Sequence, residues 1–426
     1  MAGFPFVNRG RYAAPVNGVT TAPTGSGYLF NQSGGTTFVF PEVFGNQHVP
    51  RFDASDKLSF THTGSRITQA CRFDIFANSG ADVTIDYGSN RITIVGSGNG
   101  ALLASHFDLP ASNPTPPAIT DRWGASIVGF GTGSFTYPNW TVACQKLKAM
   151  GFSWVRIIPI WSMDTVTANV VEYTAGIAHT DAETIAAIRI AKLCGLRVSM
   201  AMGLLFPNSP GGFPAQINPS NPSAWFTSYQ AAILHWAAIA QAEGLDIFSV
   251  GQEMSLMQVI GYSSNWSTLV TAVRGVFSGT IIYCSDGVND APGVFPHVDV
   301  IGFDPYVSLS ATESTDVGTL TTAFTNNILT PISALATSYS KQAMISEIGY
   351  QSLSDCMVSP FGGTGSISDA AQDACYAAMK AAIDASGAFL KYIWLWDFGQ
   401  YNSALITKSD YSVYGKTAAA RVDGWF

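Results

Sequence analysis

The sequence IFSVGQE at Ile247–Glu253 and the sequence AMISEIGY at Ala343–Tyr350 share one pattern, in which an apolar run leads to a single glutamate. A strand that is buried on both faces of a parallel sheet typically reads as a continuous apolar run of this kind. A carboxylate at the end of such a strand lies where the chain leaves the core. Two such strands can direct two carboxylates, Glu253 and Glu347, toward one substrate.

Apolar runs of the same kind alternate with amphipathic helical patterns from about residue 119 onward. Gly151, Gly195 and Gly244 stand where three of the helical patterns end, as expected of a left-handed residue at a helix C-terminus. Alternating units with right-handed crossovers build a parallel sheet, and eight units fit a closed (β/α)8 barrel, a TIM barrel of the α/β class. The predicted strands are 127–130, 154–159, 197–202, 247–250, 280–283, 298–303, 343–346 and 390–395.

An open, doubly wound sheet is the alternative α/β arrangement. That fold carries a G-x-G-x-x-G turn after its first strand, which binds a phosphate group. The corresponding loop here contains GFGTG at Gly129–Gly133, which does not match. The closed barrel is therefore the predicted fold.

Residues 1–118 have a different pattern, in which short alternating runs such as Thr37–Phe40 lie between turns rich in Gly, Ser and Asn. This pattern predicts a small β-rich accessory domain before the barrel. Its first 35 residues show little periodicity and are expected to form an extended arm. The prolines within 110–117 favour an extended linker, so we place the domain boundary there and the barrel at 119–426.

Charge and composition narrow the class of partner. The chain has 426 residues, with 21 Lys plus Arg against 29 Asp plus Glu, and only 12% of its residues are charged. A basic field that would hold a polyanion is missing, so nucleic acid is not expected as a partner. No apolar stretch reaches the eighteen or so residues that a membrane helix needs, so insertion into a membrane is not expected either. A surface that is polar but mostly uncharged suits a neutral polymer.

The motifs predict neither a metal nor another cofactor. The six histidines form no H-E-x-x-H motif, and the sequence contains no G-x-S-x-G elbow and no P-loop. The six cysteines lack the short paired spacings of a zinc site or of a dense disulfide frame. Cys356 and Cys375 flank a Gly/Ser-rich loop and are the pair placed to form a bridge, and the sequence leaves open whether they do.

Barrel enzymes carry their catalytic groups at the carboxyl ends of the strands. Glu253 ends the fourth predicted strand and Glu347 the seventh, so the two side chains are expected to face each other across the barrel mouth. Cleavage of a glycosidic bond needs such a pair, because one carboxyl group protonates the leaving oxygen while the other attacks the anomeric carbon. A separation near 5 Å gives a retaining enzyme and a wider gap an inverting one, and the sequence does not fix that gap.

Other side chains near the strand ends are candidate substrate contacts. Arg156, in the second strand, is expected to hydrogen-bond Glu347 and keep it ionised, and Tyr306, after the sixth strand, to orient the same carboxylate. The aromatic candidates for stacking on a pyranose ring are Trp161, Phe206 and Trp396, and the polar candidates for contacts with sugar hydroxyls are His179, Gln252, Asp286 and Asp304.

Each of these residues also has a structural interpretation. A strand-end glutamate can bond a neighbouring loop, and Arg156 can fix the barrel layers as part of a buried ion pair. The aromatic residues can simply pack at the top of the barrel. His179 can cap the following helix together with Thr180.

Several short motifs occur in an order typical of clan A glycoside hydrolases, namely WVRI at 154–157, VGQE at 250–253, IGFDPY at 301–306, SEIGY at 346–350 and WLWD at 394–397. By these motifs residues 120–426 resemble glycoside hydrolase family 113, which is known for β-1,4-mannanases, and also the barrel-like domain of gene-transfer-agent and phage tail proteins. The resemblance implies an endo-acting enzyme in which Glu253 is the acid/base and Glu347 the nucleophile. Most of the clan has Asn before the acid/base, where this chain has Gln252.

Two main hypotheses of function follow. In the first, a retaining glycoside hydrolase cleaves a β-linked polysaccharide, with mannan as the first candidate and a cell-wall glycan as another, and the accessory domain positions substrate or attaches the enzyme to a larger assembly. In the second, the barrel is a glycan-binding or assembly part of a phage particle or cell surface, with slow or no turnover. The amino terminus lacks the charged-then-apolar order of a secretory signal, and the expected location is extracellular or on a virion.

Overall fold

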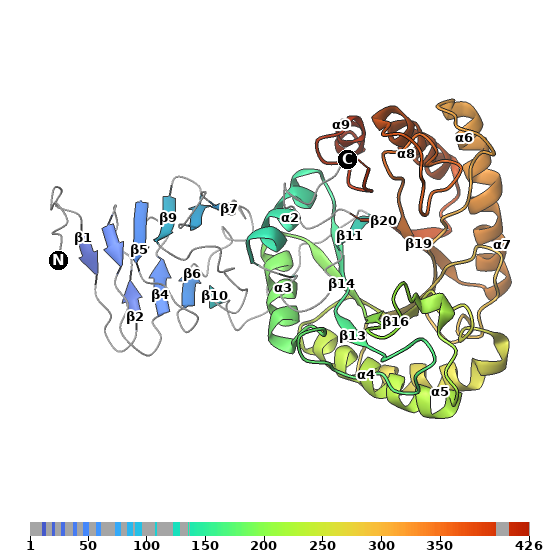
Figure 1. Cartoon of the computed structure of the whole chain (residues 1–426), viewed down its shortest axis with the longest axis horizontal. Coiled ribbons are helices and arrows are strands. Elements are labelled where there is room, and N and C mark those ends of the chain that lie inside the picture. The colour runs from blue at the N-terminus through green and yellow to red at the C-terminus, as the bar shows by residue number, and fades with distance from the viewer. Residues whose placement is uncertain are drawn as a thin grey trace.

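A computed structural model describes the barrel over residues 122–127, 135, 137–397 and 409–425, together with ten short strands between residues 11 and 108. In the barrel, each strand pairs in parallel with the next and the last pairs with the first. The (β/α)8 barrel predicted from the sequence is therefore confirmed (Figure 1). Its strands are β11 (Trp123–Ile127), β12 (Trp154–Ile157), β14 (Arg197–Ala201), β16 (Ile247–Gln252), β17 (Thr280–Ser285), β18 (Val300–Phe303), β19 (Gln342–Ile348) and β20 (Leu390–Leu395).

The first strand, β11, begins at Trp123, earlier than the predicted strand 127–130, of which residues 128–130 lie outside the described residues. Its sequence WGASI contains small residues instead of a continuous apolar run. The structure gives the reason at Gly124, where a Cβ atom would lie 2.4 Å from the ring of Trp394. A small residue is needed in this strand because the indole of Trp394 fills the space beside it.

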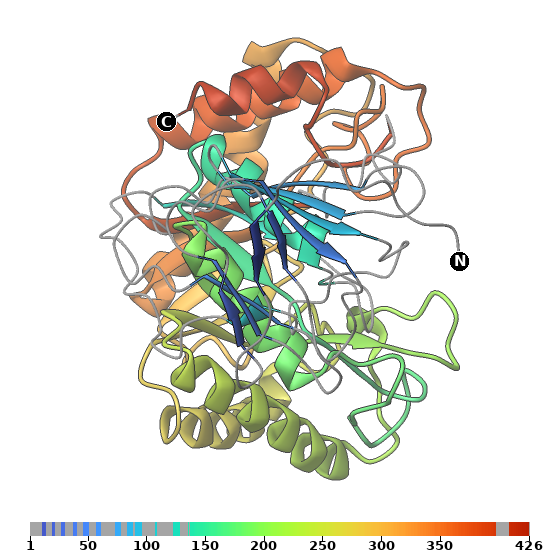
Figure 2. The same cartoon turned by 90° about the vertical axis from the view of Figure 1, so that its left-hand side faces the viewer.

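Helices surround the barrel and cover the outer face of its strands (Figure 1). Gly151, Gly195 and Gly244 have φ values of 92°, 76° and 61°, so the three predicted left-handed positions at the helix ends are confirmed. Figure 2 shows α8 beside α6, on the opposite side of the barrel from α4 and α5. The helices are α2 (Tyr137–Ala149), α3 (Asp181–Leu193), α4 (Pro222–Ala242), α5 (Ser263–Arg274), α6 (Val317–Phe324), the π-helical turn η4 (Thr325–Leu329), α7 (Thr330–Tyr339), α8 (Asp369–Ala385) and α9 (Thr417–Asp423), with short 3₁₀ turns η2 (Pro214–Gln216) and η3 (Ile260–Tyr262).

The lower part of the barrel interior is packed with side chains and is not a pore. A cluster of buried residues that is separate from the main core fills it, with members from six of the eight strands. Packed layers of this kind leave only the ends of a barrel free for a ligand. The members are Trp154, Ile247, Ile282, Cys284, Val300, Met344 and Trp394.

Two further strands lie in loops at the carboxyl ends of the barrel strands. β13 (Ile160–Ser162) follows β12, β15 (Gly203–Leu205) follows β14, and the two pair in parallel. The long loop between β19 and α8 contains Cys356, whose Sγ lies 3.6 Å from that of Cys375. Both thiols are buried and both are free, so the possible bridge between them is not formed in this structure.

The region before the barrel is β-rich, as the sequence predicts. The strands form a six-stranded sheet in the order β1-β3-β5-β9-β8-β7 and a four-stranded sheet in the order β10-β6-β4-β2. Three of them fall within the first 35 residues, where an extended arm was expected, and the predicted linker lies outside the described residues. The strands are β1 (Arg11–Ala13), β2 (Val19–Thr21), β3 (Gly27–Leu29), β4 (Thr37–Phe40), β5 (Asn46–Pro50), β6 (Lys57–Phe60), β7 (Phe73–Ala77), β8 (Val83–Tyr87), β9 (Asn90–Val95) and β10 (Phe107–Asp108).

No helix in the described part of the chain combines the length and the apolar character that crossing a membrane requires.

Candidate active site

Glu253 directly follows β16 and Glu347 lies near the end of β19, so both carboxylates reach the carboxyl-terminal mouth of the barrel. They converge there with Asp304, which follows β18, and one carboxylate oxygen from each of the three residues lies within 4.8 Å of the others. All three side chains are buried, with exposed fractions of 6%, 3% and 1% for Glu253, Glu347 and Asp304. The barrel thus brings two opposed strand ends to one point.

The backbone at Glu253 is unusual. Its φ is +54°, and among the described residues other than glycine only Ser340 shares a positive value. The pairing of β16 with β17 shifts register between Ser249 and Gln252, after which the Glu253 amide donates to the Cys284 carbonyl at 2.8 Å. Left-handed backbone costs about 1–3 kcal/mol for such a residue and persists where the surrounding structure enforces it, often at functional sites. The bulge changes the direction of the chain at the point where the Glu253 carboxylate enters the cleft.

Arg156 connects the residues around Glu347. Its guanidinium is fully buried and donates to Glu347 Oε1 at 3.0 Å, to Gln252 Oε1 at 2.6 Å and to the Ser346 carbonyl at 3.3 Å. The Gln252 amide in turn donates to Glu347 Oε1 at 3.2 Å. Two donors, one of them charged, therefore converge on one oxygen of Glu347, which favours its ionised form.

Glu253 has a different environment. Burial raises the pKa of Glu253 well above its usual value, and the charges of Asp304 and Asp286 raise it further, whereas Arg156 lowers it by a smaller effect. Burial also raises the pKa of Glu347 well above its usual value and the charge of Asp304 raises it further, but there Arg156 opposes the shift by direct contact. No ion pair to Glu253 occurs within the described residues. Glu347 therefore has a positive charge in direct contact that favours its ionised form, whereas Glu253 has no such partner among the described residues.

Asp304 is the third acid of the cluster. It accepts a hydrogen bond from the Ser346 hydroxyl at 2.5 Å, and its Oδ2 has no hydrogen-bond partner within the described part of the chain. Burial raises its pKa to about 7, against the opposing effect of Arg156. Three carboxylates at this spacing resemble a metal site, but the guanidinium of Arg156 already occupies the position of the positive charge beside Glu347.

A cleft of about 470 Å³ opens above these acids. Its two halves differ in character, because acidic and amide groups from the ends of β16–β19 face apolar side chains from the loops after β12 and β14. Ile158, Ile160, Leu205 and Trp396 form a small apolar cluster of their own along the cleft. The polar lining residues are Gln252, Glu253, Asp286, Asp304, Tyr306 and Glu347, and the apolar ones include Met202, Leu204, Phe213, Met254 and Phe361.

Five of the substrate contacts predicted from the sequence line this cleft, and Arg156 lies beneath it in contact with Glu347. Tyr306 differs from expectation in one respect, because its buried hydroxyl forms no hydrogen bond with any described residue, Glu347 included. Trp396 is held close to Glu347 by a hydrogen bond from its amide to the Ile348 carbonyl at 2.8 Å. The five lining residues are Gln252, Asp286, Asp304, Tyr306 and Trp396.

Three other predicted contacts lie outside the cleft. Successive side chains of a strand point to opposite faces, and in β13 it is Ile160 that lines the cleft, whereas the ring of Trp161 packs against Tyr173, His235 and Trp236. Phe206 is buried in the main core, below the loop that presents Phe213.

His179 is a core residue and not a sugar contact. It is fully buried, stacks on Phe135 with ring centroids 4.5 Å apart, and accepts a hydrogen bond from the Ile160 amide through Nδ1. Burial lowers its pKa to about 4, so the ring is neutral at pH 7. The N-terminal cap of α3 is Thr180, whose hydroxyl accepts from the Glu183 amide at 3.2 Å.

The sequence analysis missed Phe213 and Phe361, which lie on loops and not at strand ends. A signal was present, because each stands beside a glycine pair, in Gly211-Gly212-Phe213 and Phe361-Gly362-Gly363. A pair of glycines in a loop marks a tight turn.

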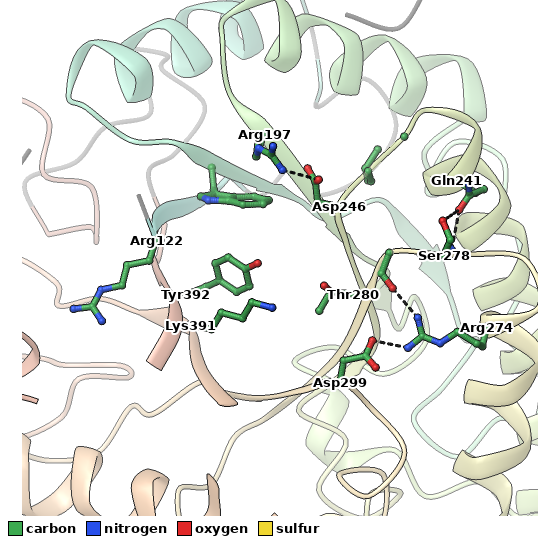
Figure 3. A pocket seen from close by; sticks show the side chains of 14 residues that line it. Arg122, Arg197, Gln241, Asp246, Arg274, Ser278, Thr280, Asp299, Lys391 and Tyr392 are labelled. Atoms are coloured by element: carbon green, nitrogen blue, oxygen red, sulfur yellow. Dashed lines mark hydrogen bonds and ion pairs between the residues drawn. The ribbon is translucent and has the colours of Figure 1, made fainter. Parts of the chain in front are cut away.

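A larger hollow, of about 750 Å³, lies at the amino-terminal ends of the strands (Figure 3). Its charged residues are mostly paired, with Arg197 2.6 Å from Asp246 and Arg274 2.5 Å from Asp299. Because barrel enzymes place their chemistry at the opposite end, we assign the active site to the smaller cleft and a structural role to these ion pairs.

Comparisons with known proteins identify the family and the fold of the barrel. The model of glycoside hydrolase family 113 matches residues 127–416. Among solved structures, a family 113 β-1,4-mannanase is similar at a TM-score of 0.62 and 23% identity, covering 71% of this chain and 97% of its own. The β-mannanase AaManA from Alicyclobacillus acidocaldarius, in complex with ManMIm, gives 0.61 and 21%, covering 71% and 95%. These identities show a shared fold. No curated protein sequence matches the chain.

Proposed function

We propose, from the premise that the chain belongs to glycoside hydrolase family 113, that it hydrolyses a β-linked polysaccharide by a retaining mechanism, with β-1,4-mannan as the first candidate substrate. Family membership makes the protein a glycoside hydrolase. The stereochemical course and the sugar are the proposed part.

One observation carries the retaining mechanism. One carboxylate oxygen of Glu253 and one of Glu347 lie within 4.8 Å of each other, which is compatible with the separation of about 5–5.5 Å typical of retaining enzymes. Inverting enzymes need a gap of about 6.5–9.5 Å, which leaves room for a water molecule between carboxylate and sugar. The narrow gap supports direct attack by one of the two carboxylates.

The first step breaks the glycosidic bond. Glu347, ionised through Arg156, attacks the anomeric carbon and forms a covalent ester, while Glu253 gives its proton to the departing oxygen. In the second step Glu253, now a carboxylate, takes a proton from a water molecule that attacks the same carbon and releases Glu347. The two inversions restore the original configuration and return both carboxyl groups to their starting states.

The neighbouring residues have supporting roles in this proposal. Gln252 touches both Arg156 and Glu347, so its amide holds the nucleophile in place and lies within reach of a sugar hydroxyl. Trp396 offers an apolar face to the pyranose ring beside Glu347. Asp304 has a free oxygen that can accept a hydrogen bond from a sugar hydroxyl.

Mannan is the first candidate because the similar solved structures are described as β-mannanases. The test is hydrolysis of soluble β-1,4-mannan and of a cell-wall glycan panel, with the anomer of the first product identified by ¹H NMR. We expect the β-anomer to appear first. The α-anomer as first product would refute the retaining mechanism, and binding without turnover would favour a silent barrel that only holds glycan.

Variants separate the two acids. Glu347→Ala and Glu253→Ala should each abolish release of reducing sugar from the polysaccharide. With an aryl β-mannoside, whose leaving group departs without protonation, azide should rescue them differently, giving the α-glycosyl azide with Glu347→Ala and the β-glycosyl azide with Glu253→Ala. Glu243→Ala is the matched control, because Glu243 is also buried but pairs with Arg189 away from the cleft. Wild-type rates in both active-site variants would contradict the assignment.

A further inference from the structure

Two exposed phenylalanine rings meet over the cleft. Phe213 belongs to the loop between β15 and α4, Phe361 belongs to the loop between β19 and α8, and both line the cleft. Their ring centroids are 6.0 Å apart and the rings are inclined by 44°. The two loops leave the barrel after its third and seventh strands, which stand on opposite sides. The ring contact, here called the Phe213–Phe361 bridge, therefore spans the mouth of the cleft.

Glycines next to Phe213 and Phe361 form the turns that expose the two rings. Gly211 and Gly362 have φ values of +75° and +80°, in the left-handed region that glycine adopts without strain. A Cβ atom on Gly212 would lie 2.8 Å from the Ser209 carbonyl oxygen, so the turn that carries Phe213 also needs its second glycine. Phe213 and Phe361 keep 36% and 65% of their residue surface exposed, although burial of apolar surface normally favours covering such side chains.

Both loops are fixed by hydrogen bonds of their own. In the first, the Asn208 amide donates to the Asp164 carbonyl at 2.9 Å. In the second, Tyr411 donates to the Pro360 carbonyl at 2.9 Å, next to Phe361, and the Thr364 amide donates to Asp355 at 2.8 Å. Phe361 also contacts the cleft residue Tyr306, with ring centroids 6.1 Å apart. The Phe213–Phe361 bridge is thus a contact between two loops that hydrogen bonds fix in place.

The distance between the two rings limits the size of a group that can lie between them. A sugar ring between two aromatic rings needs about 7–8 Å, twice the usual carbon contact distance of 3.5–4.0 Å. The observed 6.0 Å is too small, so nothing of that size fits between Phe213 and Phe361 unless they separate. A long glycan must extend across the mouth on both sides of the bond that is cut, whereas a short one can enter beside the bridge.

We propose that the Phe213–Phe361 bridge sets chain-length preference, so that the enzyme cleaves short β-linked oligosaccharides more readily than the interior of a long polysaccharide. The proposal rests on the proposed hydrolase function and adds to it a selection by substrate length. The bridge acts on access and takes no part in the bond-breaking steps, which belong to Glu253 and Glu347.

The test compares kcat/KM for β-1,4-mannohexaose with kcat/KM for a soluble glucomannan in the wild-type chain and in Phe213→Ala, Phe361→Ala and the double variant. Either single change should raise the ratio of polymer to hexaose kcat/KM by roughly 2–10-fold, the range that one aromatic contact is worth. The double variant should gain no more than either single one, because both changes remove the same contact. Ile367→Ala is the matched control, as it shortens an exposed apolar side chain of the β19–α8 loop that does not line the cleft.

The possible results of this test separate a failure of the bridge proposal from a failure of the proposed hydrolase function. Thermal unfolding of each variant within about 2 °C of wild type shows that the fold is kept, as expected for exposed residues. A wild-type enzyme that cleaves both substrates, with a ratio that stays constant or falls in the alanine variants, overturns the bridge proposal and leaves the hydrolase function standing. Absence of turnover of every glycan by the wild-type chain overturns the function and the bridge proposal with it.

Discussion

Replacing Arg156 by methionine should remove most of the activity at neutral pH by protonating the nucleophile. The guanidinium lies 3.0 Å from Glu347 and is buried with it, so no solvent screens the pair. Burial raises the pKa of Glu347 and Arg156 opposes that effect, so loss of the arginine raises the pKa further. A nucleophile must be ionised to attack, and its charged fraction falls as its pKa rises past the working pH.

The expected loss of activity follows from the contact between Arg156 and Glu347. An opposite charge at this distance changes the ionised fraction of a carboxyl group by about 10–1000-fold at a pH below its pKa. We expect kcat/KM for mannohexaose at pH 6 to fall within that range in Arg156→Met, and the acidic limb of the pH profile to move to higher pH. Arg156→Lys should restore part of the loss, because the ammonium keeps the charge but cannot span Glu347 and Gln252 together.

The measurement is a profile of kcat/KM against pH for wild type, both Arg156 variants and Arg189→Met. Arg189 pairs with Glu243 at 2.6 Å away from the cleft, so its variant reports the effect of losing an ion pair without touching the site. Removing one partner of a buried pair costs about 3–5 kcal/mol of stability, and rates are therefore compared well below each measured Tm. An equal loss in Arg156→Met at every pH, with the acidic limb unmoved, would show that Arg156 acts through position and not through charge.

Three further results are expected. Burial raises the pKa of Asp304 to about 7, so the stability associated with its protonated form is present at low pH and lost as the pH rises through about 7. Asp304→Asn should therefore raise Tm at pH 8.5 and change it little at pH 4. An equal shift in Tm at both pH values would contradict this pKa. Burial lowers the pKa of His179 to about 4, so wild-type stability falls as the pH drops from about 6.5 toward 4; His179→Asn should lose that pH dependence in thermal unfolding while leaving KM unchanged. Trp396→Ala should raise KM for mannohexaose about tenfold, whereas Trp161→Leu, outside the cleft, should leave KM within about twofold of wild type. A larger rise in KM for Trp161→Leu than for Trp396→Ala would instead support Trp161 as the ring that stacks on the sugar.

Strand ends are the part of the site that sequence patterns predict well. A buried parallel strand must be apolar, so a charged residue at its end stands out, and the order of strands then fixes which ends face each other. That reasoning placed Glu253, Glu347 and Arg156 in one neighbourhood, where the structure also has them. The same logic missed the start of the first strand, since packing against Trp394 requires a glycine at Gly124 where a continuous apolar run was expected.

Loops are the part that patterns predict poorly. Trp161 and Phe206 were chosen because they follow strands, but the direction of a side chain beyond a strand depends on pairing between loops, here that of β13 with β15. Phe213 and Phe361 line the cleft although neither follows a barrel strand directly in sequence. Their positions depend on turns and tertiary contacts that no periodicity encodes.

The division of the cleft into a polar and an apolar half follows from the barrel itself. Glu253, Asp304 and Glu347 converge from three strands, and burying that many acids is tolerable only where Arg156 and shared protons offset their mutual repulsion. Ile158, Ile160 and Leu205 line the opposite wall with apolar groups, and a less polar surrounding strengthens the charge interactions beside it. A pyranose has a hydroxyl-bearing edge and apolar C–H faces, so it satisfies both halves at once. In the proposed mechanism the apolar wall therefore acts together with the acids, because burial raises the pKa of Glu253 and so favours the protonated form that a general acid needs.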